Sequence, residues 1–446
     1  MANIDDKIPA PMITPERAPA VQYSKSYVRY VIGILTVVYI FNFMDRQILS
    51  ILMQPIKEEM QLSDTQLGFL SGVAFALFYA TLGIPIARLA DQYSRVNLIT
   101  ICLSIWSFMT VLSGMAANFW QLLAARIGVG IGEAGGSPSS HSLIADYVPV
   151  QNRATALGVF ALGVPIGLMV GFQVGGWLDQ NYGWRTAFLV AGVPGLLLAV
   201  ILRFTVREPK RGHSQTQAQI VHVDQPSIKQ VAQHMRSIRT FRLLCIACAL
   251  QAFAGYGLIQ WLPSFLSRSH QMSSGDIGFW LAMTIGVGGA IGSIGGGYFA
   301  DRFSRRNIGW QLWLPAIGSL LGALLSFGVL LSDLQASVMV FVLLQSIAVN
   351  AYLGPGFAVT QTLSPVRMRA IASALLLFAI NIIGLGLGPQ VVGILSDQLN
   401  PAFGDDALRY AILSVCMAYF GAAAFFMVAG RVVRDDFSRA AVLEAA

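Results

Sequence analysis

Charged residues are scarce in this sequence. Only 11% of its 446 residues are Asp, Glu, Lys or Arg, whereas 55% are hydrophobic. Soluble domains carry about 25% charged residues. So few charges cannot give a globule of this size a water-exposed surface. This excludes an ordinary soluble enzyme and predicts a polytopic membrane protein.

Cysteine and the motifs of enzymes are also lacking. The four cysteines all lie in apolar runs and are too few for a disulfide framework. Cys245 and Cys248 form a C-x-x-C pair, which inside an apolar helix we interpret as two small packing residues. No P-loop or hydrolase motif is present, which argues against ATP-driven transport. We therefore expect no enzymatic activity, no cofactor and no bound metal.

One glycine pattern has the spacing of a cofactor site. Gly130, Gly132 and Gly135 fit the dinucleotide-binding fingerprint. That fingerprint needs a preceding strand, and none is indicated here. We predict instead that these glycines form a face on which helices pack closely.

Long uncharged runs are the main feature of the sequence. Each can hold a helix of about 17–25 residues, enough to cross a bilayer core about 30 Å thick. Ten such runs are present: 65–87, 96–125, 154–178, 186–202, 243–267, 277–300, 307–332, 334–366, 370–396 and 410–430. Charges interrupt two further apolar runs, 28–53 and 119–146, and the first helix should end near residue 53. The predicted fold is an all-α membrane protein with twelve transmembrane helices.

The basic residues predict the orientation of these helices. With the N-terminus inside, twenty-three of the 29 lysines and arginines fall in inner segments and four in outer segments. By the positive-inside rule, both termini are then cytoplasmic and the chain is a multi-pass protein of the cell (inner) membrane. The same distribution explains the net charge of +7 without a nucleic-acid partner.

The longest connection divides the chain into halves. We expect a flexible tail at 1–26, six-helix bundles at 27–206 and 240–433, a linker at 207–239 and a tail at 434–446. Apolar residues recur at helical spacing in the linker: Ile228, Val231, Ala232, Met235 and Ile238. This predicts a short amphipathic helix, either on the inner membrane surface or packed against the protein.

Similar inner loops indicate an internal repeat. The loops after the second and eighth helices share residue types at 90/300, 91/301, 94/304, 95/305 and 97/307. The loops after the fourth and tenth helices share Pro-Val and Arg-Ala, at 149–154 and 365–370. Two six-helix units related by an axis along the membrane normal are typical of transporters in which two bundles rock.

The same loops resemble a known superfamily. The Gly-x-x-x-Asp-Arg-x-x-Arg pattern at 297–305 resembles the loop signature of the major facilitator superfamily. The pattern is degenerate at 87–95, where Ala87 and Gln92 replace the usual Gly and Arg. Arg126-x-x-x-Gly130 is similar to a second signature. The resemblance implies the major facilitator fold and a function in transport.

Within that superfamily, the sequence resembles the Spinster family. The matching segments are Asn42-Phe43-Met44-Asp45-Arg46, with Phe43 for the usual Tyr, Gly132-Glu133-Ala134 and Ile144-Ala145-Asp146. Spinster proteins move sphingolipids and lysophospholipids, and the resemblance implies such substrates. Proton symporters of sugar acids and other organic anions have similar Asp-Arg and Glu-Ala pairs, so this alternative stays open.

Four ionisable residues lie well inside the predicted helices: Asp45, Arg46, Arg126 and Glu133. An unpaired charge at the bilayer centre costs roughly 2.5–3.5 kcal/mol. Because the four charges sum to zero, we expect them to pair or to line a wet cavity, with Asp45 close to Arg126. We assign proton coupling to Asp45 and Glu133 and substrate binding to Arg46 and Arg126. The alternative is a static brace between the first and fourth helices.

Uncharged polar residues complete the candidate substrate site. Asn42 belongs to the motif of the first helix, and Tyr256, Asn350 and Asn381 lie in the second half. The helices of the second half contain no comparable charge. One ionic wall and one largely apolar wall suit an amphiphile with an anionic head and an apolar tail.

The repeated loops also predict a cytoplasmic gate. Its candidate residues are the six charged residues of these loops: Asp91, Arg95, Arg153, Asp301, Arg305 and Arg369. The two aspartates lie at inner helix ends beside the repeat-related Arg153 and Arg369. We expect charge-assisted contacts between them to hold the cytoplasmic side closed.

These features predict a secondary transporter that works by alternating access. It would move an anionic lipid or lysolipid, coupled to protons, in contact with membrane lipids. The first alternative is a proton-coupled symporter of organic anions such as hexuronates. The second is a non-transporting receptor or scaffold, against which the loop signatures in both halves argue.

Overall fold

The computed structural model describes residues 23–209 and 227–445. In this part of the chain all regular structure is helical and no strand is formed. Several spans are broken into consecutive helices, so the helices outnumber the spans.

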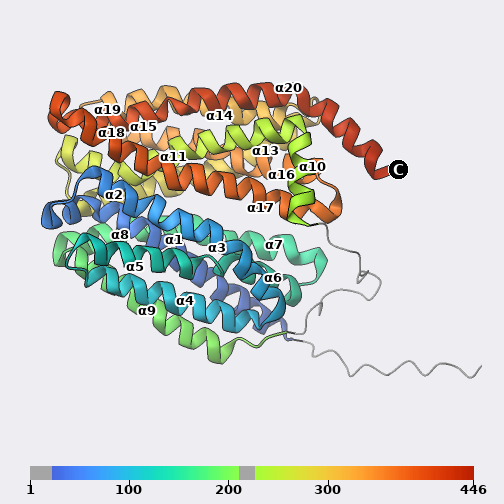
Figure 1. The fold of residues 1–446 in the computed structure, drawn as a ribbon, viewed down its shortest axis with the longest axis horizontal. Helices are drawn as coiled ribbons and strands as arrows, with labels where there is room; N and C mark the ends of the chain where they lie inside the picture. Colours follow the sequence, from blue (N-terminus) through green and yellow to red (C-terminus); the bar gives the residue numbers. More distant parts are fainter. Residues whose placement is uncertain (1–22, 210–226, 446) are drawn as a thin grey trace, which may run out of the picture.

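Six spans make up the first half, drawn in blue to green in Figure 1. In chain order they are α1 (Lys25–Met60), α2 (Asp64–Ser71) with α3 (Val73–Gln92), α4 (Arg95–Gly114), α5 (Phe119–Glu133) with α6 (Gly136–Tyr147), α7 (Val150–Ala161) with α8 (Gly163–Tyr182), and α9 (Trp184–Thr205).

Six more spans make up the second half, drawn in yellow-green to red. They are α11 (Arg239–His270); α12 (Ser274–Leu281), η2 (Ala282–Val287) and α13 (Gly288–Ser304); α14 (Trp310–Leu331); α15 (Gln335–Val349), η3 (Asn350–Tyr352) and α16 (Leu353–Leu363); η4 (Val366–Met368), α17 (Arg369–Ala379), η5 (Ile380–Leu387) and α18 (Gly388–Phe403); and η6 (Gly404–Asp406), α19 (Ala407–Cys416) and α20 (Ala418–Ala445).

The prediction of twelve spans in an all-α fold is confirmed. Ten helical stretches are long and apolar enough to cross a membrane, and the last of them, Arg369–Arg439, contains two spans. The pair α5 and α6 adds the twelfth. Its apolar character is interrupted by Arg126 and Glu133, as the sequence indicates.

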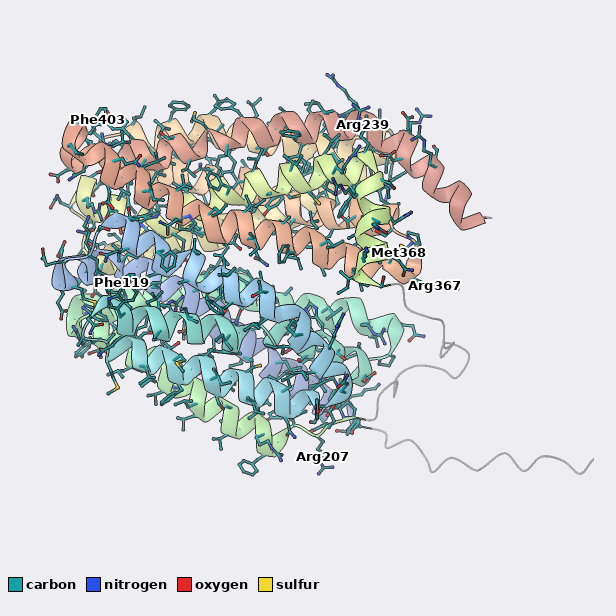
Figure 2. The ribbon with its side chains drawn as sticks, in the orientation of Figure 1. Phe119, Arg207, Arg239, Arg367, Met368 and Phe403 are labelled. Carbon is teal, nitrogen blue, oxygen red and sulfur yellow. The ribbon has the colours of Figure 1, made fainter. Side chains whose placement is uncertain are left out.

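The two halves form two bundles that lie side by side (Figure 1). We call the end at which α9 ends, Thr205, and α11 begins, Arg239, the inner end, following the distribution of basic residues, and the opposite end the outer end. In Figure 2, Phe119 and Phe403 mark the outer end, and Arg207, Arg239 and Arg367 mark the inner end.

The apolar core is continuous at the outer end and divided at the inner end. One cluster of buried residues joins both bundles, with Leu52 and Phe172 from the first half and Trp261 and Leu281 from the second. Two further clusters lie toward the inner end, one mainly in each bundle. The bundles are therefore packed together most extensively at the outer end, and in Figure 1 their ribbons diverge toward the inner end.

The first helix is longer than the sequence predicts. The apolar run indicates an end near residue 53, but α1 continues to Met60. The helix continues past the apolar run because polar side chains in its last turns find partners at the outer end: Lys57 donates to Asp64, and Gln54 accepts from Arg268. Asp45 consequently lies fifteen residues from the end of α1, about 22 Å at about 1.5 Å per residue.

Glycines allow α8 to lie directly against α1. A Cβ atom at Gly167 would lie 2.6 Å from the carbonyl oxygen of Ile40, and one at Gly171 would lie 2.8 Å from that of Met44. The fingerprint-like glycines behave in the same way, since a Cβ at Gly132 would lie 2.6 Å from the amide nitrogen of Trp106. This is helix packing, as the sequence indicates.

A short amphipathic helix, α10 (Ile228–Ser237), lies in the linker. A capping box at Ser227 and Gln230 starts it. Val231 and Met235 are fully buried and belong to the inner cluster of the second bundle. The apolar side of α10 therefore packs against the second bundle, and its place at the membrane surface stays a prediction.

Substitution of Gly167 tests the contact between α1 and α8. Gly167→Ala should lower stability by about 1–3 kcal/mol, because the new methyl group overlaps the backbone of α1. Gly158→Ala, on the preceding helix, is the matched control, since a Cβ placed there would have no other atom within 4 Å and alanine favours helix. Thermal unfolding of the purified variants measures both. Equal melting temperatures for Gly167→Ala and the parent would refute the close contact.

Candidate functional site

The four intramembrane charges converge between α1 and α5. Asp45, Arg46, Arg126 and Glu133 are each at most 8% exposed. Asp45 and Arg46 lie past the middle of α1, and Glu133 is the last residue of α5. The structure therefore brings the predicted coupling and binding residues together inside the first bundle.

Arg46 and Glu133 form an ion pair. The Nε atom of Arg46 donates to Oε2 of Glu133 at 2.7 Å. The guanidinium of Arg46 also lies over three aromatic rings, with its central carbon 4.9 Å from the ring centroids of Phe43 and Phe75 and 4.6 Å from that of Tyr79. These contacts stabilise a cation in a site with little access to water. Among the described residues, Nη2 of Arg46 and Oε1 of Glu133 are buried without a hydrogen-bond partner.

Asp45 is held by a hydroxyl group rather than by an arginine. Thr110 on α4 donates to Oδ2 of Asp45, while Oδ1 is buried and has no partner in the part of the chain that the structure describes. The same hydroxyl lies 3.0 Å from the carbonyl oxygen of Trp106. A hydroxyl has one proton, so Thr110 can donate to Asp45 or to Trp106, but not to both at once. An ionised Asp45 accepts this proton, whereas a protonated Asp45 can donate to the hydroxyl and leave its proton for Trp106.

Arg126 makes no ion pair within 4.0 Å in the described part of the chain. Its Nε and Nη1 atoms are buried and unpartnered there, and its guanidinium carbon lies 5.7 Å from the ring centroid of Phe75. The expected pairing of Asp45 with Arg126 is therefore not formed, and the closed pair is Arg46–Glu133. The ring of Phe75 lies against both guanidinium groups and stabilises each cation by a cation–π contact.

Asn42 lies one helical turn before Arg46. It is 3% exposed, and its Oδ1 atom has no hydrogen-bond partner within residues 23–209 and 227–445. A small cavity beside it is also lined by Tyr39, Trp106 and Ser140. Among the described residues, the candidate site thus contains unpartnered donors on its arginines and unpartnered acceptors on its carboxylates and on Asn42.

The second bundle presents few free polar groups to this site. Tyr256 packs against the inner clusters of both bundles. Asn350 donates to the carbonyl oxygen of Ser346 on its own span, and Asn381 lies in the π-helical turn η5. Gln251 is tied to Val349 and Ser319 inside the second bundle. Tyr256 therefore lies between the bundles, since it packs against clusters of both.

Among the predicted gate residues, Arg95 is almost completely buried. It pairs with Asp146 and, at 2.7 Å, with Glu208 at the start of the linker. Glu208 also accepts from Ser94 and from the amide of Val96. Arg95 therefore anchors the start of the linker to the first bundle.

The other gate candidates lie near the inner helix ends. Arg153 donates to the carbonyl oxygen of Ala145 at 2.8 Å, and Arg369 to that of Ser364 at 3.3 Å. Asp301 and Arg305 are exposed, and Arg305 directly follows the end of α13. The side chain of Asp91 lies outside the part that the structure describes.

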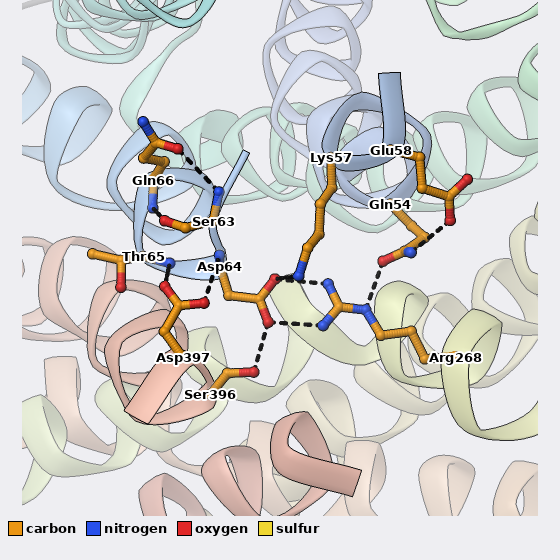
Figure 3. Close-up of polar contacts among 10 residues, drawn as sticks. All are labelled: Gln54, Lys57, Glu58, Ser63, Asp64, Thr65, Gln66, Arg268, Ser396 and Asp397. Carbon is orange, nitrogen blue, oxygen red and sulfur yellow. Dashed lines mark hydrogen bonds and ion pairs between the residues drawn. The ribbon is translucent and has the colours of Figure 1, made fainter. Parts of the chain in front are cut away.

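A network of polar contacts joins the bundles at the outer end (Figure 3). Asp64 at the start of α2 receives both terminal nitrogens of Arg268 from α11, at 2.7 and 2.8 Å, and the hydroxyl of Ser396 from α18 at 2.6 Å. Asp397, also on α18, accepts from the backbone amides of Asp64 and Thr65. We call these five residues the outer seam. Sequence reasoning missed it because its members are ordinary polar residues that come together from three helices far apart in the sequence, α2, α11 and α18.

Comparison with known proteins identifies the family. The model described as Major Facilitator Superfamily matches residues 35–389, and the chain belongs to this superfamily. It is therefore a multi-pass membrane protein of a family of transporters. The resemblance found in the sequence is confirmed at this level.

Individual relatives are informative. An MFS-type efflux pump of Mycolicibacterium smegmatis is 35% identical over 419 residues, which cover 92% of this chain and 94% of the relative. A probable galactarate/D-glucarate transporter of Bacillus subtilis is 26% identical over 375 residues, covering 78% and 81%.

A solved structure is also similar over most of the chain. It is a bacterial homologue of the human lysosomal transporter Spinster, in an inward-facing and unoccupied conformation. The TM-score is 0.85 at 32% identity, covering 93% of this chain and 99% of that one. The Spinster resemblance seen in the sequence is thereby confirmed.

Substitution of the two buried arginines distinguishes a brace from a binding site. Arg46→Leu should lower stability by about 3–5 kcal/mol, because it leaves Glu133 buried without its partner. Arg126→Leu should instead raise stability, because it removes a buried cation that has no ion pair among the described residues. Thermal unfolding in detergent compares the two variants. Equal destabilisation by both would mean that Arg126 is a structural brace.

Proposed function

We propose that this chain is a secondary active transporter that moves an anionic lipid or lysolipid by alternating access, coupled to protons. The observation that carries the proposal is the incomplete pairing of the four intramembrane charges. One closed ion pair, Arg46–Glu133, stands beside a buried arginine and a buried carboxylate that lack ionic partners in the described part of the chain. Intramembrane charges of this kind are retained for ion and substrate handling.

Arg46 and Arg126, with Asn42, hold the anionic head of the substrate in this proposal. A planar guanidinium suits the two oxygens of a phosphate or carboxylate group. Within the described residues, Arg126 has two unpartnered nitrogens and Arg46 has one. Their unsatisfied donors are the groups that an anion would satisfy.

The carboxylates Asp45 and Glu133 carry the coupled protons. Protonation of Glu133 removes the anion that holds Arg46 and so releases this arginine for the substrate. A bound anionic head in turn replaces the carboxylate as counter-ion. Proton binding and substrate binding are then linked by a coupling free energy that acts in both directions.

The apolar tail lies against the second bundle. That bundle contributes Tyr256, Asn350 and Asn381 to the proposed site. Asn350 already donates to Ser346 of its own bundle, and the nearby Gln251 donates to Val349, so few of its polar groups are left for a substrate. One ionic wall and one mainly apolar wall fit an amphiphile better than a small sugar acid, which would use polar groups on both walls.

The bundles at 27–206 and 240–433 move as units in this transport cycle. The continuous core at the outer end and the divided core at the inner end support an inward-facing state. Asp91, Asp301 and the loop arginines Arg95, Arg153, Arg305 and Arg369 form the cytoplasmic gate that closes in the opposite state. Both termini are cytoplasmic, and the chain lies in the cell's inner membrane.

A second candidate substrate class is the small organic anions, such as hexuronates. The similarity to a probable galactarate/D-glucarate transporter favours it. The two candidates share an anionic group and differ in the apolar tail, so competition between lysolipids and sugar acids distinguishes them.

Binding and flux in proteoliposomes test the substrate site. Arg46→Ala and Arg126→Ala should each reduce uptake of a labelled lysolipid at least tenfold, and lysine should rescue poorly because it lacks the planar fork. Arg242→Ala, an exposed arginine at the inner end, is the matched control and should transport normally. Normal binding by both alanine variants would place the anionic head elsewhere. Preferential transport of labelled hexuronate would favour the second candidate.

Neutral variants of the carboxylates test coupling. Asp45→Asn and Glu133→Gln mimic the protonated forms, so at least one should bind substrate but lose the dependence of transport on a pH gradient. Asp333→Asn, an exposed carboxylate, should keep the parental dependence. If both intramembrane variants respond to the gradient as the parent does, the carboxylates are not coupling residues.

A further inference from the structure

The N-terminus of α2 is capped by a residue of the other bundle. Within the first bundle, the amide of Ser63 donates to Oε1 of Gln66 at 3.0 Å, and the amide of Gln66 donates to the hydroxyl of Ser63 at 3.1 Å. The two remaining free amides, of Asp64 and Thr65, donate to Asp397 at 3.1 and 2.7 Å. All four amides that a helix start leaves unpaired are therefore satisfied, two of them across the bundle interface.

The carboxylate of Asp64 is bound in the opposite direction. It belongs to the first bundle and accepts from Arg268 and Ser396 of the second (Figure 3). Each bundle thus contributes one carboxylate that the other bundle satisfies. Such an arrangement is complete only while the outer ends are in contact, since separation breaks both sets of bonds together.

We propose that Asp397 and Asp64 are gating residues that stabilise the inward-facing state through these reciprocal contacts. The proposal rests on the alternating access of the proposed function, but not on its substrate or its coupling ion. Asp397 caps the start of α2 only in the state in which the outer ends are in contact. Its negative charge at the start of α2 adds a favourable interaction with the helix dipole in that state alone.

Lys57 has a separate role in the same network. It lies on α1 and donates to Oδ1 of Asp64 at 2.6 Å, within the first bundle. This bond survives when the bundles separate, so Asp64 keeps one cation after it loses Arg268. In the closed state Lys57 and Arg268 both donate to Oδ1 of Asp64, so the two cations repel each other there and no longer do so after separation. Lys57 therefore favours the open outer end relative to the closed one.

The seam has a counterpart in the gate that the sequence predicts at the inner end. Asp397 lies toward the end of the span that contains α17, and it caps the start of the span that α3 ends. Asp91 lies at the inner end of α3, and Arg369 begins α17. The same two spans thus carry charged groups at both ends, which suits contacts that form alternately.

Distances between spin labels in lipid nanodiscs test the proposal without substrate or pH gradient. One label pair, at Ala117 and Asn400, reports the outer ends; another, at Gln92 and Gln361, reports the inner ends. All four positions are exposed, and the four native cysteines are replaced by alanine. Asp405→Asn, an exposed carboxylate at the outer end, is the matched control.

Asp397→Asn and Asp64→Asn should each raise the ratio of outward-facing to inward-facing molecules about tenfold or more, as expected for loss of a charge-assisted hydrogen bond. Outer distances should lengthen and inner distances shorten. Ser396→Ala, which removes one donor, should shift the ratio in the same direction by a smaller factor. Addition of Lys57→Gln to Asp397→Asn should partly reverse the shift.

Parental distances in Asp397→Asn and Ser396→Ala would overturn the proposal. So would an equal shift in Asp405→Asn, because that would be a general effect of surface charge. Failure of the proposed substrates in flux assays would leave the distance result standing. Conversely, if the parent transports substrate but the seam variants keep the parental distances, only the gating role of the outer seam is refuted.

Discussion

The first bundle depends on the buried ion pair between Arg46 and Glu133. Both groups are removed from water, so each needs the other as its partner. Burial of one charge without a partner costs several kcal/mol, and a membrane offers no alternative solvent. The pair is closed at 2.7 Å and lies among three aromatic rings. The rest of the first bundle is arranged around this requirement: glycines of α8 allow close contact with α1, and glycines of α5 allow contact with α3 and α4. Helices that approach so closely exclude water and lipid from the charges.

The aromatic residues of α3 link this pair to the second bundle. Phe75 contacts both guanidinium groups, and it stacks on Tyr79 with ring centroids 5.4 Å apart. The same helix also packs against the second bundle. Gly72, at the start of α3, lies close to the carbonyl oxygen of Gly386 in η5. One helix, α3, therefore contacts both the charged site and the second bundle.

The sequence predicts the spans and the four charges well because both follow from the cost of burying polar groups in a membrane. It does not predict the end of α1, because Lys57 and Gln54 are polar residues whose partners, Asp64 and Arg268, come from other helices. It also expects Asp45 beside Arg126, whereas Arg126 makes no ion pair among the described residues. Depth along a helix can be estimated from residue numbers, but the angle at which a side chain leaves the helix depends on packing. Thr110, Phe75 and Tyr79 carry no signal of their own, since hydroxyl and aromatic residues are common on helix faces that meet lipid or protein.

In the proposed alternating-access cycle, the division of the core limits how the outward-facing state can be built. In the present state a single apolar cluster joins the outer ends, while the inner ends have separate clusters. For both states to be populated, their free energies must differ by no more than a few kcal/mol. Separation of the outer ends loses apolar contact, the hydrogen bonds that Asp64 and Asp397 make across the bundle interface, and the contact of Ser50 with the carbonyl oxygen of Gln260. The inner ends must supply contacts of similar total strength when they close. The repeated inner loops contain the aspartates and arginines that can make such contacts. In the proposed cycle, the contacts of these loops in one state balance those of the outer seam in the other.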